Sequence, residues 1–229
     1  MVTPRKPCLV FGDLHIPYQH EHALEFLCET YNKYDCGSVA CTGDLCDFHA
    51  MSRHVTELDS LSPNEEYAKM LDLTAELTRI FPKAKLVLGN HCQIPQRQMK
   101  EIGLSTAMLR SYNDLYGLGK GWKIDPLYHT IFDGEVLVEH GIGSGGMYGC
   151  INTAIAKRTS YVQGHTHSYA MVAYRSNYKS TIFGMNTGCL FNSNSLAARY
   201  GVHSKWKGVL GCGVVYAPDH AEFIPMRGK

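Results

Sequence analysis

Histidine, aspartate and asparagine recur in this sequence where apolar runs end, in the short segments DLH (13–15), GDLCD (43–47), GNH (89–91), EHG (139–141) and GHTH (164–167). Each segment alone has an ordinary explanation. Gly-Asp after a strand is commonly a turn, and a single histidine is usually a surface or core residue. Five such segments are harder to assign to turns. Imidazole, carboxylate and amide groups together are typical metal ligands, so these residues indicate metal chemistry.

Two cation sites account for seven of these residues. The predicted ligands are Asp13, His15, Asp44 and His167 for one ion, and Asp44, Asn90, His140 and His165 for the other. A shared Asp44 would hold the ions about 3.5–4 Å apart, the separation used for in-line displacement at phosphorus. The ligand types suit Mn²⁺ as the first choice, with Fe, Zn²⁺ or Ni²⁺ as alternatives, and the absence of cysteine ligands argues against a structural zinc site.

The charge of such a site indicates the substrate. Two divalent ions and two aspartates leave about +2, which lowers the pKa of a bridging water and attracts an anion. A phosphate ester is the natural substrate of that arrangement.

The elements that must position these residues follow from the apolar patterns. Segments 8–11, 38–44 and 85–90 read as short strands, and apolar residues recur at helical spacing from Ala23. A second helix is expected after Ser62, where SPNE supplies an N-cap, a proline in the first turn and a glutamate three residues on. This alternation of strand and helix predicts βαβ units and a parallel sheet.

The second half of the chain has a different pattern. Segments 129–141, 160–165, 180–188, 210–217 and 221–226 read as strands with little helix between them, the first as two strands around an Asp-Gly turn. We expect an α/β half followed by a β-rich half, packed as two sheets with helices outside. Ligands bind beyond the carboxyl ends of strands in open α/β sheets, so the polar segments could converge there.

Composition limits the alternatives. The 229 residues carry a formal charge of +1, which gives no global basic field for nucleic acid, and no linker or repeat is visible, so we expect a single domain over 1–229. The nine cysteines are scattered without a CxxC pair and are expected to be reduced. Neither a signal peptide nor a run of membrane length is present, so a cytoplasmic location and no membrane partner are expected.

The five segments, in this order, resemble the blocks of the calcineurin-like metallophosphoesterase superfamily over residues 13–167. The resemblance implies a four-layer αββα sandwich, with two mixed β-sheets flanked by helices and a dinuclear metal centre. It also implies that His91 is the general acid for the leaving oxygen and that Asp47 is its partner. A carboxylate partner raises the pKa of an imidazole and orients the ring, as a proton donor requires. The GHTH pair resembles the phosphodiesterase, nuclease and small-phosphatase branches, and the short chain is similar to phage and bacterial members.

Cys92 departs from the resemblance, because the family usually has Asp or Glu after the Asn-His pair. A thiol is a weak hydrogen-bond acceptor and cannot brace the loop as a carboxylate does. Either the bracing comes from elsewhere, or the geometry of the metal site and turnover suffer. An Asp or Glu at this position would restore a strong acceptor for the N–H groups of the loop, so we expect it to hold or raise turnover.

The sequence therefore predicts a phosphoesterase that cleaves a phosphodiester or small phosphate ester with a metal-bridging hydroxide. Candidate substrate contacts are Arg53, His54 and Arg97, since guanidinium groups match phosphate oxygens. One alternative is a nuclease or cyclic-nucleotide phosphodiesterase, with a nucleic acid or nucleotide as partner. Another is a metal-binding scaffold with weakened catalysis, motivated by Cys92. The sequence does not fix the oligomeric state.

Overall fold

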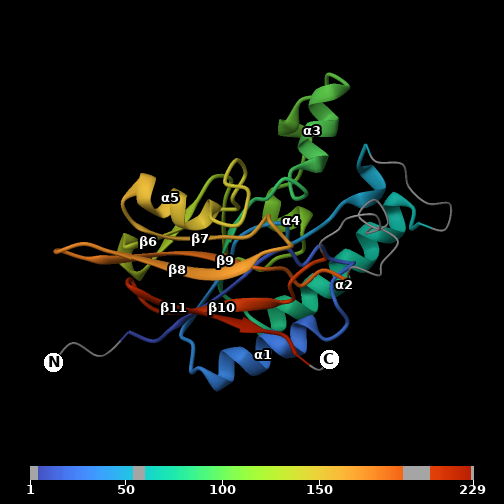
Figure 1. Ribbon diagram of the computed structural model, residues 1–229. Helices are drawn as coiled ribbons and strands as arrows, with labels where there is room; N and C mark the ends of the chain where they lie inside the picture. Colours follow the sequence, from blue (N-terminus) through green and yellow to red (C-terminus); the bar gives the residue numbers. More distant parts are fainter. Residues whose placement is uncertain (1–4, 54–59, 193–206, 228–229) are drawn as a thin grey trace.

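The computed structural model describes residues 5–53, 60–192 and 207–227, and Figure 1 shows their arrangement. A six-stranded sheet has the order β11-β10-β1-β2-β3-β4. Its strands are β1 (Cys8–Phe11), β2 (Ser38–Cys41), β3 (Ala84–Val87), β4 (Trp122–Asp125), β10 (Gly211–Ala217) and β11 (His220–Pro225). The strands from β1 to β4 are parallel, whereas β10 pairs antiparallel with both β1 and β11, so the sheet is mixed.

A five-stranded sheet has the order β5-β6-β7-β9-β8. Its strands are β5 (His129–Ile131), β6 (Val136–Val138), β7 (Ser160–Gln163), β8 (Ala170–Ser176) and β9 (Thr181–Thr187). Here β6, β7 and β9 are parallel, while β5 and β8 pair antiparallel at the two edges. The predicted pair of strands around Asp133-Gly134 is confirmed as β5 and β6, with the short helix η3 (Phe132–Gly134) between them.

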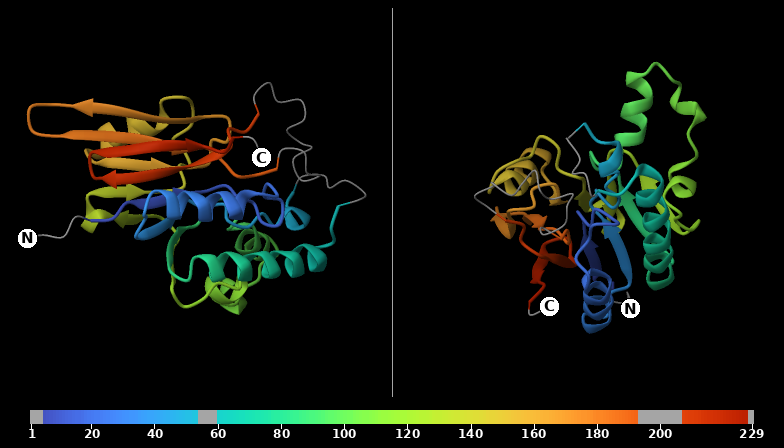
Figure 2. Two further views of the ribbon diagram at one scale, coloured as in Figure 1. Left: turned by 90° about the horizontal axis from the view of Figure 1, so that it is seen from below. Right: turned by 90° about the vertical axis from the view of Figure 1, so that its right-hand side faces the viewer.

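The described helices are α1 (Ala23–Lys33), α2 (Pro63–Ile80), α3 (Ile94–Glu101), α4 (Tyr112–Leu115) and α5 (Gly149–Lys157), with the 3-10 turns η1 (His49–Met51) and η2 (Thr106–Met108). Helices α1, α2 and α5 flank the two sheets, whereas α3 projects away from them and packs on the 3-10 turns η1 and η2 (Figure 1). Figures 1 and 2 show α1 and α2 on one side of the paired sheets and α5 on the other. The predicted αββα sandwich is confirmed.

Alternating side chains of β1 show how the layers are filled. Leu9 and Phe11 belong to the apolar core under α1 and α2, whereas Cys8 and Val10 belong to the core between the two sheets. This two-residue alternation is what a strand with both faces buried requires. A third, smaller core lies between α5 and the five-stranded sheet, around Ile151 and Tyr161.

The predicted start of the second helix is confirmed in detail. The hydroxyl of Ser62 accepts the backbone N–H of Glu65, and the Glu65 carboxylate accepts the backbone N–H of Ser62 at 2.9 Å. This reciprocal pair is a capping box. None of the described helices is long and apolar enough to cross a membrane.

The expected division into an α/β half and a β-rich half is wrong in one respect. The hairpin of β10 and β11 joins the first sheet beside β1, so that sheet contains the first strand and the last two strands of the described residues. The pattern 210–226 predicts the strands but carries no signal for their partner, because partner choice depends on packing between distant segments. The sequence reading also missed β4, β8, α3, α4 and α5.

Candidate metal centre

The five polar segments meet at one end of the two sheets. DLH and GDLCD follow β1 and β2, GNH follows β3 closely, and EHG and GHTH follow β6 and β7. Because β1 to β3 are parallel, and β6 and β7 are parallel, the carboxyl ends of each set lie at one edge of their sheet. Both sheets therefore contribute to one cluster of side chains.

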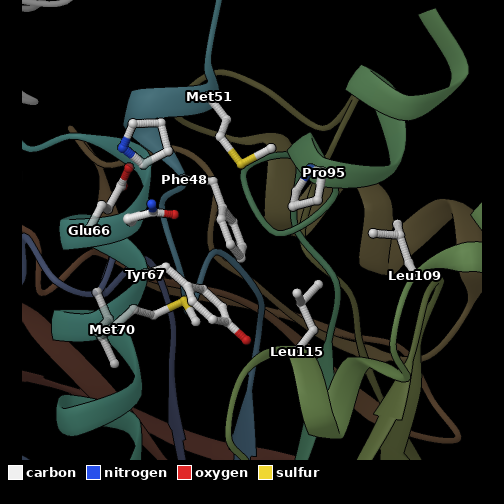
Figure 3. Close-up of a pocket in the computed structure, with 11 residues that line it drawn as sticks. Phe48, Met51, Glu66, Tyr67, Met70, Pro95, Leu109 and Leu115 are labelled. Carbon is white, nitrogen blue, oxygen red and sulfur yellow. The ribbon is translucent and has the colours of Figure 1, made fainter. Parts of the chain in front are cut away.

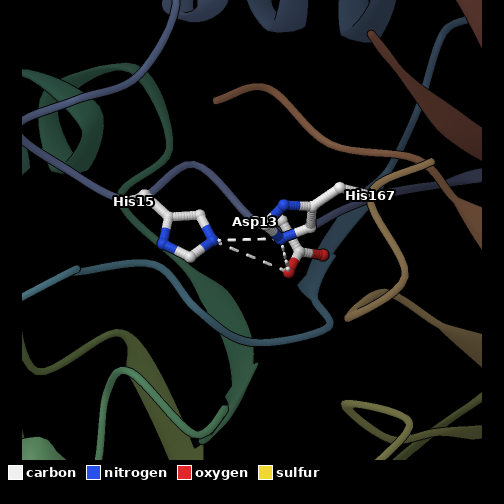
Figure 4. Close-up of side chains that lie close together, drawn as sticks. All are labelled: Asp13, His15 and His167. Carbon is white, nitrogen blue, oxygen red and sulfur yellow. Dashed lines mark hydrogen bonds and ion pairs between the residues drawn. The ribbon is translucent and has the colours of Figure 1, made fainter. Parts of the chain in front are cut away.

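Asp13, His15 and His167 form the first group of donor atoms (Figure 4). Nε2 of His167 lies 3.1 Å from Oδ1 of Asp13 and 3.2 Å from Nε2 of His15, and Nε2 of His15 lies 3.9 Å from the same Asp13 oxygen. Asp13 and His15 are buried, while the His167 side chain is 26% exposed. The open side is thus next to His167.

The donor chemistry of this group fits a cation. Nδ1 of His15 lies 2.7 Å from Oδ1 of Asp47, so it carries the ring proton and Nε2 presents a lone pair toward His167. Ligands about 2.1 Å from a central ion are separated by about 3.0–3.4 Å in octahedral or tetrahedral geometry. The two observed separations around His167 Nε2 fall within that range.

Asp44, Asn90, His140 and His165 form the second group. Nε2 of His140 lies 3.1 Å from Oδ2 of Asp44, 3.0 Å from Oδ1 of Asn90 and 3.2 Å from Nδ1 of His165. Nδ1 of His140 lies 3.0 Å from the Thr42 carbonyl and donates to it, which leaves Nε2 as the donor atom for an ion. This set also fits a divalent cation.

Electrostatics within the second group agree with this assignment. Burial alone would raise the pKa of Asp44, but neighbouring histidines, His140 above all, hold it below its usual range, so the carboxylate is ionised. Burial lowers the pKa of His165, with His140 adding to the effect, so His165 is neutral and able to ligate. Burial also lowers the pKa of His140, yet Asp44 and Asp13 raise it to about 9, so a proton competes with a metal there.

The two groups are directly connected. Oδ2 of Asp13, from the first group, accepts the backbone N–H of His165, from the second, at 2.9 Å. Asp44 lies with His140 and His165. Its predicted sharing between both ions stays a prediction.

The backbone is strained at these residues. Asp13, His15, Asp44 and His165 have φ values of 53°, 53°, 44° and 67°, in the left-handed region that residues other than glycine rarely adopt. Such conformations cost of order 1–3 kcal/mol each and cluster at functional sites. Four of the seven candidate ligands therefore occupy positions that the surrounding fold must hold.

Two glycines permit the close packing of this end of the sheets. A Cβ atom on Gly89 would collide with the Asp44 carboxylate, and one on Gly164 would collide with the Asp13 carboxylate. The glycines of GNH and GHTH are therefore required for the approach of backbone to ligand side chain.

His91 and Asp47 lie beside the first group. Nδ1 of His91 is 2.5 Å from Oδ1 of Asp47, the oxygen that also accepts from His15, and the contact is an ion pair outside hydrogen-bond geometry. Burial lowers the pKa of His91, but Asp47 and Asp44 more than offset this and raise it to about 9. The His91 side chain is 19% exposed, so a protonated imidazole reaches solvent next to the candidate ligands.

Cys92 takes no part in the donor groups among the described residues. It is fully buried in the core under α1 and α2, and burial raises the pKa of its thiol to about 12. The loop is braced by Asp44, whose Oδ1 accepts the backbone N–H of His91 at 2.8 Å and that of Cys92 at 3.4 Å. The Tyr116 hydroxyl donates to the Cys92 carbonyl at 2.6 Å. The bracing thus comes from elsewhere, and an acid at position 92 would enter an apolar core.

A cavity of about 420 Å³ opens beside His91, and both Arg53 and Arg97 line it. The guanidinium of Arg97 donates to the Asn90 carbonyl at 3.0 Å, whereas Arg53 is paired with Glu101. His54, the third predicted substrate contact, lies outside the described residues.

A second cavity of about 340 Å³ has a mainly apolar lining that includes Phe48 and Met51 (Figure 3). Glu66 of α2 stands in its wall, and its two carboxylate oxygens accept the backbone N–H groups of His49 and Ala50, each at 2.7 Å. Burial raises the pKa of Glu66 to about 7. Glu66 therefore fixes the segment that follows Asp47.

Sequence reasoning missed the supporting residues Thr42, Glu66 and Tyr116. The side chains of Glu66 and Tyr116 contact backbone groups distant in the sequence, and the backbone carbonyl of Thr42 accepts from the distant side chain of His140. Only Glu66 has a detectable signal, as a charged residue on the helix face that also carries Met70 and Leu77. The nine cysteines are free thiols, and eight of them are buried.

Comparison with known proteins gives a family. The family described as calcineurin-like phosphoesterase matches residues 6–169. A metallophosphoesterase from Sphaerobacter thermophilus has a similar structure, with a TM-score of 0.50 and 15% identity over 98% of this chain and 89% of that chain. A search of curated proteins found no match.

Two further solved structures are less similar. Vacuolar Protein Sorting 29 from Cryptosporidium parvum has a TM-score of 0.48 and 14% identity over 96% of this chain and 95% of that chain. The phosphoesterase Yfce from E. coli has a TM-score of 0.42 and 13% identity over 95% of this chain and 96% of that chain.

Proposed function

Because this chain belongs to the calcineurin-like phosphoesterase family and is a metal-dependent phosphoesterase, we propose that it hydrolyses a phosphodiester or small phosphate ester at a dinuclear centre. In this proposal one ion would be held by Asp13, His15, His167 and a shared Asp44, and the other by Asp44, Asn90, His140 and His165. Mn²⁺ is the proposed metal, with Fe, Zn²⁺ or Ni²⁺ as alternatives.

The convergence of donor atoms from both sheets carries this proposal. Asp13 and Asp44 come from the six-stranded sheet, and His140 and His165 come from the five-stranded sheet. Such a cluster of buried carboxylates and imidazoles is expensive to assemble without a cation to compensate it. Since both sheets are needed to complete it, we treat the chain as a single domain.

The residues around the cluster have distinct chemical roles in the proposal. Two divalent ions, when bound, supply Lewis-acid charge to the phosphate and to an attacking water. Hydrolysis forms one P–O bond from water and breaks the P–O bond to the leaving alcohol. His91 gives its proton to the leaving oxygen, and Asp47 orients the imidazole and stabilises its charged form.

A diester is slightly favoured over a monoester. The cavity beside His91 offers room for an esterified group on the side where the leaving oxygen takes its proton. A nuclease or cyclic-nucleotide phosphodiesterase is the form of this activity that the room in the cavity favours.

The alternative of a catalytically weakened scaffold loses the observation that motivated it. Cys92 faces the core. The backbone N–H groups of His91 and Cys92 in this loop already donate to the carboxylate of Asp44, so no carboxylate at position 92 is needed to accept them. No described contact indicates a weakened site.

The test combines metal analysis with hydrolysis of bis(4-nitrophenyl) phosphate and 4-nitrophenyl phosphate. The purified protein is stripped of metal, titrated with Mn²⁺, Fe²⁺, Zn²⁺ or Ni²⁺, and assayed on both probes. We expect two ions per chain and a higher rate on the diester. A single bound ion would overturn the dinuclear centre, and a strong monoester preference would overturn the diester assignment.

A further inference from the structure

The cavity beside His91 contains two arginines whose charges are in different states. Arg53 is neutralised by Glu101, with Nε at 3.2 Å from Oε2 and a terminal nitrogen at 2.5 Å from Oε1. Both guanidinium contacts go to one carboxylate, so Arg53 has little charge left for a ligand.

Arg97 keeps its charge. Its described side-chain partner is the uncharged carbonyl of Asn90, at 3.0 Å, and no carboxylate within the described residues pairs with it. A guanidinium has five N–H donors, so several remain for a ligand after this contact. Of the two arginines that line the cavity, Arg97 is thus the one whose charge is available to an anion.

The position of Arg97 is fixed relative to the reaction centre. The side-chain oxygen of Asn90 faces His140, whereas its backbone oxygen holds Arg97, so one residue connects the candidate metal ligands with the guanidinium. The same helix is tied to the segment after Asp47, because the Gln98 amide donates to the Met51 carbonyl at 2.9 Å. The cavity between them is bounded by His91, the proposed donor to the leaving oxygen.

We propose that Arg97 is a specificity-determining residue, which selects phosphodiesters whose leaving alcohol carries a second phosphate. The leaving group enters the cavity past His91, and its phosphate accepts a forked pair of N–H groups from Arg97. A volume of about 420 Å³ lies in the range of small-molecule sites. This inference rests on the proposed function, because it needs His91 on the leaving-group side.

The experiment compares three dinucleotides with the Mn²⁺-loaded protein. Thymidylyl-thymidine is assayed without a terminal phosphate, with a 5′-terminal phosphate and with a 3′-terminal phosphate, and the products identify the nucleoside that leaves. We expect kcat/KM to be roughly 10- to 100-fold higher when the leaving nucleoside carries the phosphate, the range of a charge-assisted hydrogen bond. The readout is the ratio of kcat/KM between substrates with and without the second phosphate. Arg97 also donates to the carbonyl of Asn90, a candidate metal ligand, so its substitution could lower the rate on every substrate, whereas this ratio reports recognition of the second phosphate.

Three variants test the residue. Arg97→Ala should abolish the preference, mainly through KM, and Arg97→Lys should keep part of it because the charge remains without the fork. Lys100→Ala, which removes an exposed cation of the same helix outside the cavity lining, should keep the full preference. Binding of thymidine 3′,5′-bisphosphate to the metal-free protein, measured by calorimetry, should weaken at least tenfold in Arg97→Ala.

The outcomes separate the two proposals. If the dinucleotides and bis(4-nitrophenyl) phosphate all resist hydrolysis, the proposed function fails and the inference fails with it. If diesters are cleaved without preference for a phosphorylated leaving group, or if Arg97→Ala keeps the preference, the inference alone is overturned.

Discussion

One carboxylate oxygen of Asp47 lies 2.5 Å from Nδ1 of His91, and the same oxygen lies 2.7 Å from Nδ1 of His15. Asp47 therefore connects the proposed proton donor with a candidate metal ligand. A single carboxylate sets the orientation of both imidazoles, which links metal binding to proton transfer.

Substitution of Asp47 should weaken both metal binding and turnover, whereas substitution of His91 should lower turnover alone. We expect Asp47→Asn to weaken binding of the first ion by about 10- to 100-fold, since the carboxylate orients His15, and also to lower turnover. His91→Ala should keep both ions and lower turnover by roughly 10²- to 10⁴-fold. The checks are metal content after dialysis and rates on a nitrophenyl ester and on an alkyl ester. The loss of turnover in His91→Ala should be smaller for the nitrophenyl ester, because a good leaving group needs less protonation. Equal losses of turnover on the two esters would count against the role of His91 as general acid.

The two aspartates of the centre should not be equivalent. Asp44→Asn is expected to cost more turnover and more bound metal than Asp13→Asn, because Asp44 is proposed to serve both ions. In addition, Oδ1 of Asp44 accepts the backbone N–H of His91 at 2.8 Å, which a neutral amide oxygen does more weakly. Metal analysis and turnover are compared for the two variants. Retention of both ions and normal rates in Asp44→Asn would contradict the dinuclear assignment.

Gly89 should be intolerant of a methyl group. Gly89→Ala places a Cβ atom against the Asp44 carboxylate, so we expect loss of metal and a decrease of about 1–3 kcal/mol in the free energy of unfolding. Gly119→Ala is the matched control, since a Cβ there meets no atom within 4 Å, and its stability should stay within about 0.5 kcal/mol. Urea denaturation and metal titration measure both. Normal metal binding in Gly89→Ala would contradict this prediction, since it would show that the loop can move to admit the added Cβ atom.

Cys92 should matter for stability rather than for metal binding. Cys92→Ser keeps both ions and costs about 1–3 kcal/mol, because a hydroxyl replaces a buried thiol. Cys92→Asp should destabilise more strongly, since it buries a carboxylate in the core close to Asp44, and this reverses the expectation from the sequence that an acid there would hold or raise turnover. Cys28→Ser, at a partly exposed position, is the control. Loss of one ion in folded Cys92→Ser would show that the thiol is a ligand.

Glu66 should make stability depend on pH. Its folded pKa of about 7 lies above the ordinary value of 4.5, so the folded state holds a proton that the unfolded state has lost between these values. The contribution of Glu66 to the free energy of unfolding therefore falls as pH rises from about 4.5 to 7, by at most about 3 kcal/mol. Denaturation of the wild type and of Glu66→Gln is compared at pH 5 and pH 8. The stability difference between the two proteins should change with pH, and a constant difference would contradict the raised pKa.

The sequence by itself determined the strands that carry the site, because short apolar runs ending in Gly-Asp, Gly-Asn or Gly-His are local signals. It also gave the capping box at Ser62, which depends on residues only three positions apart. The candidate ligands were predicted from residue type and position, since histidine, aspartate and asparagine recurred at the ends of successive predicted strands.

Tertiary structure decided which of these groups meet and what supports them. The pairing of β10 with β1, the double contact of Asp47 with His15 and His91, and the pairing of Arg53 with Glu101 all join segments distant in the sequence. So does the bracing of the Cys92 loop by Asp44 and Tyr116. Such contacts depend on how the two sheets pack against each other. Local patterns of hydrophobicity and residue spacing do not predict that packing.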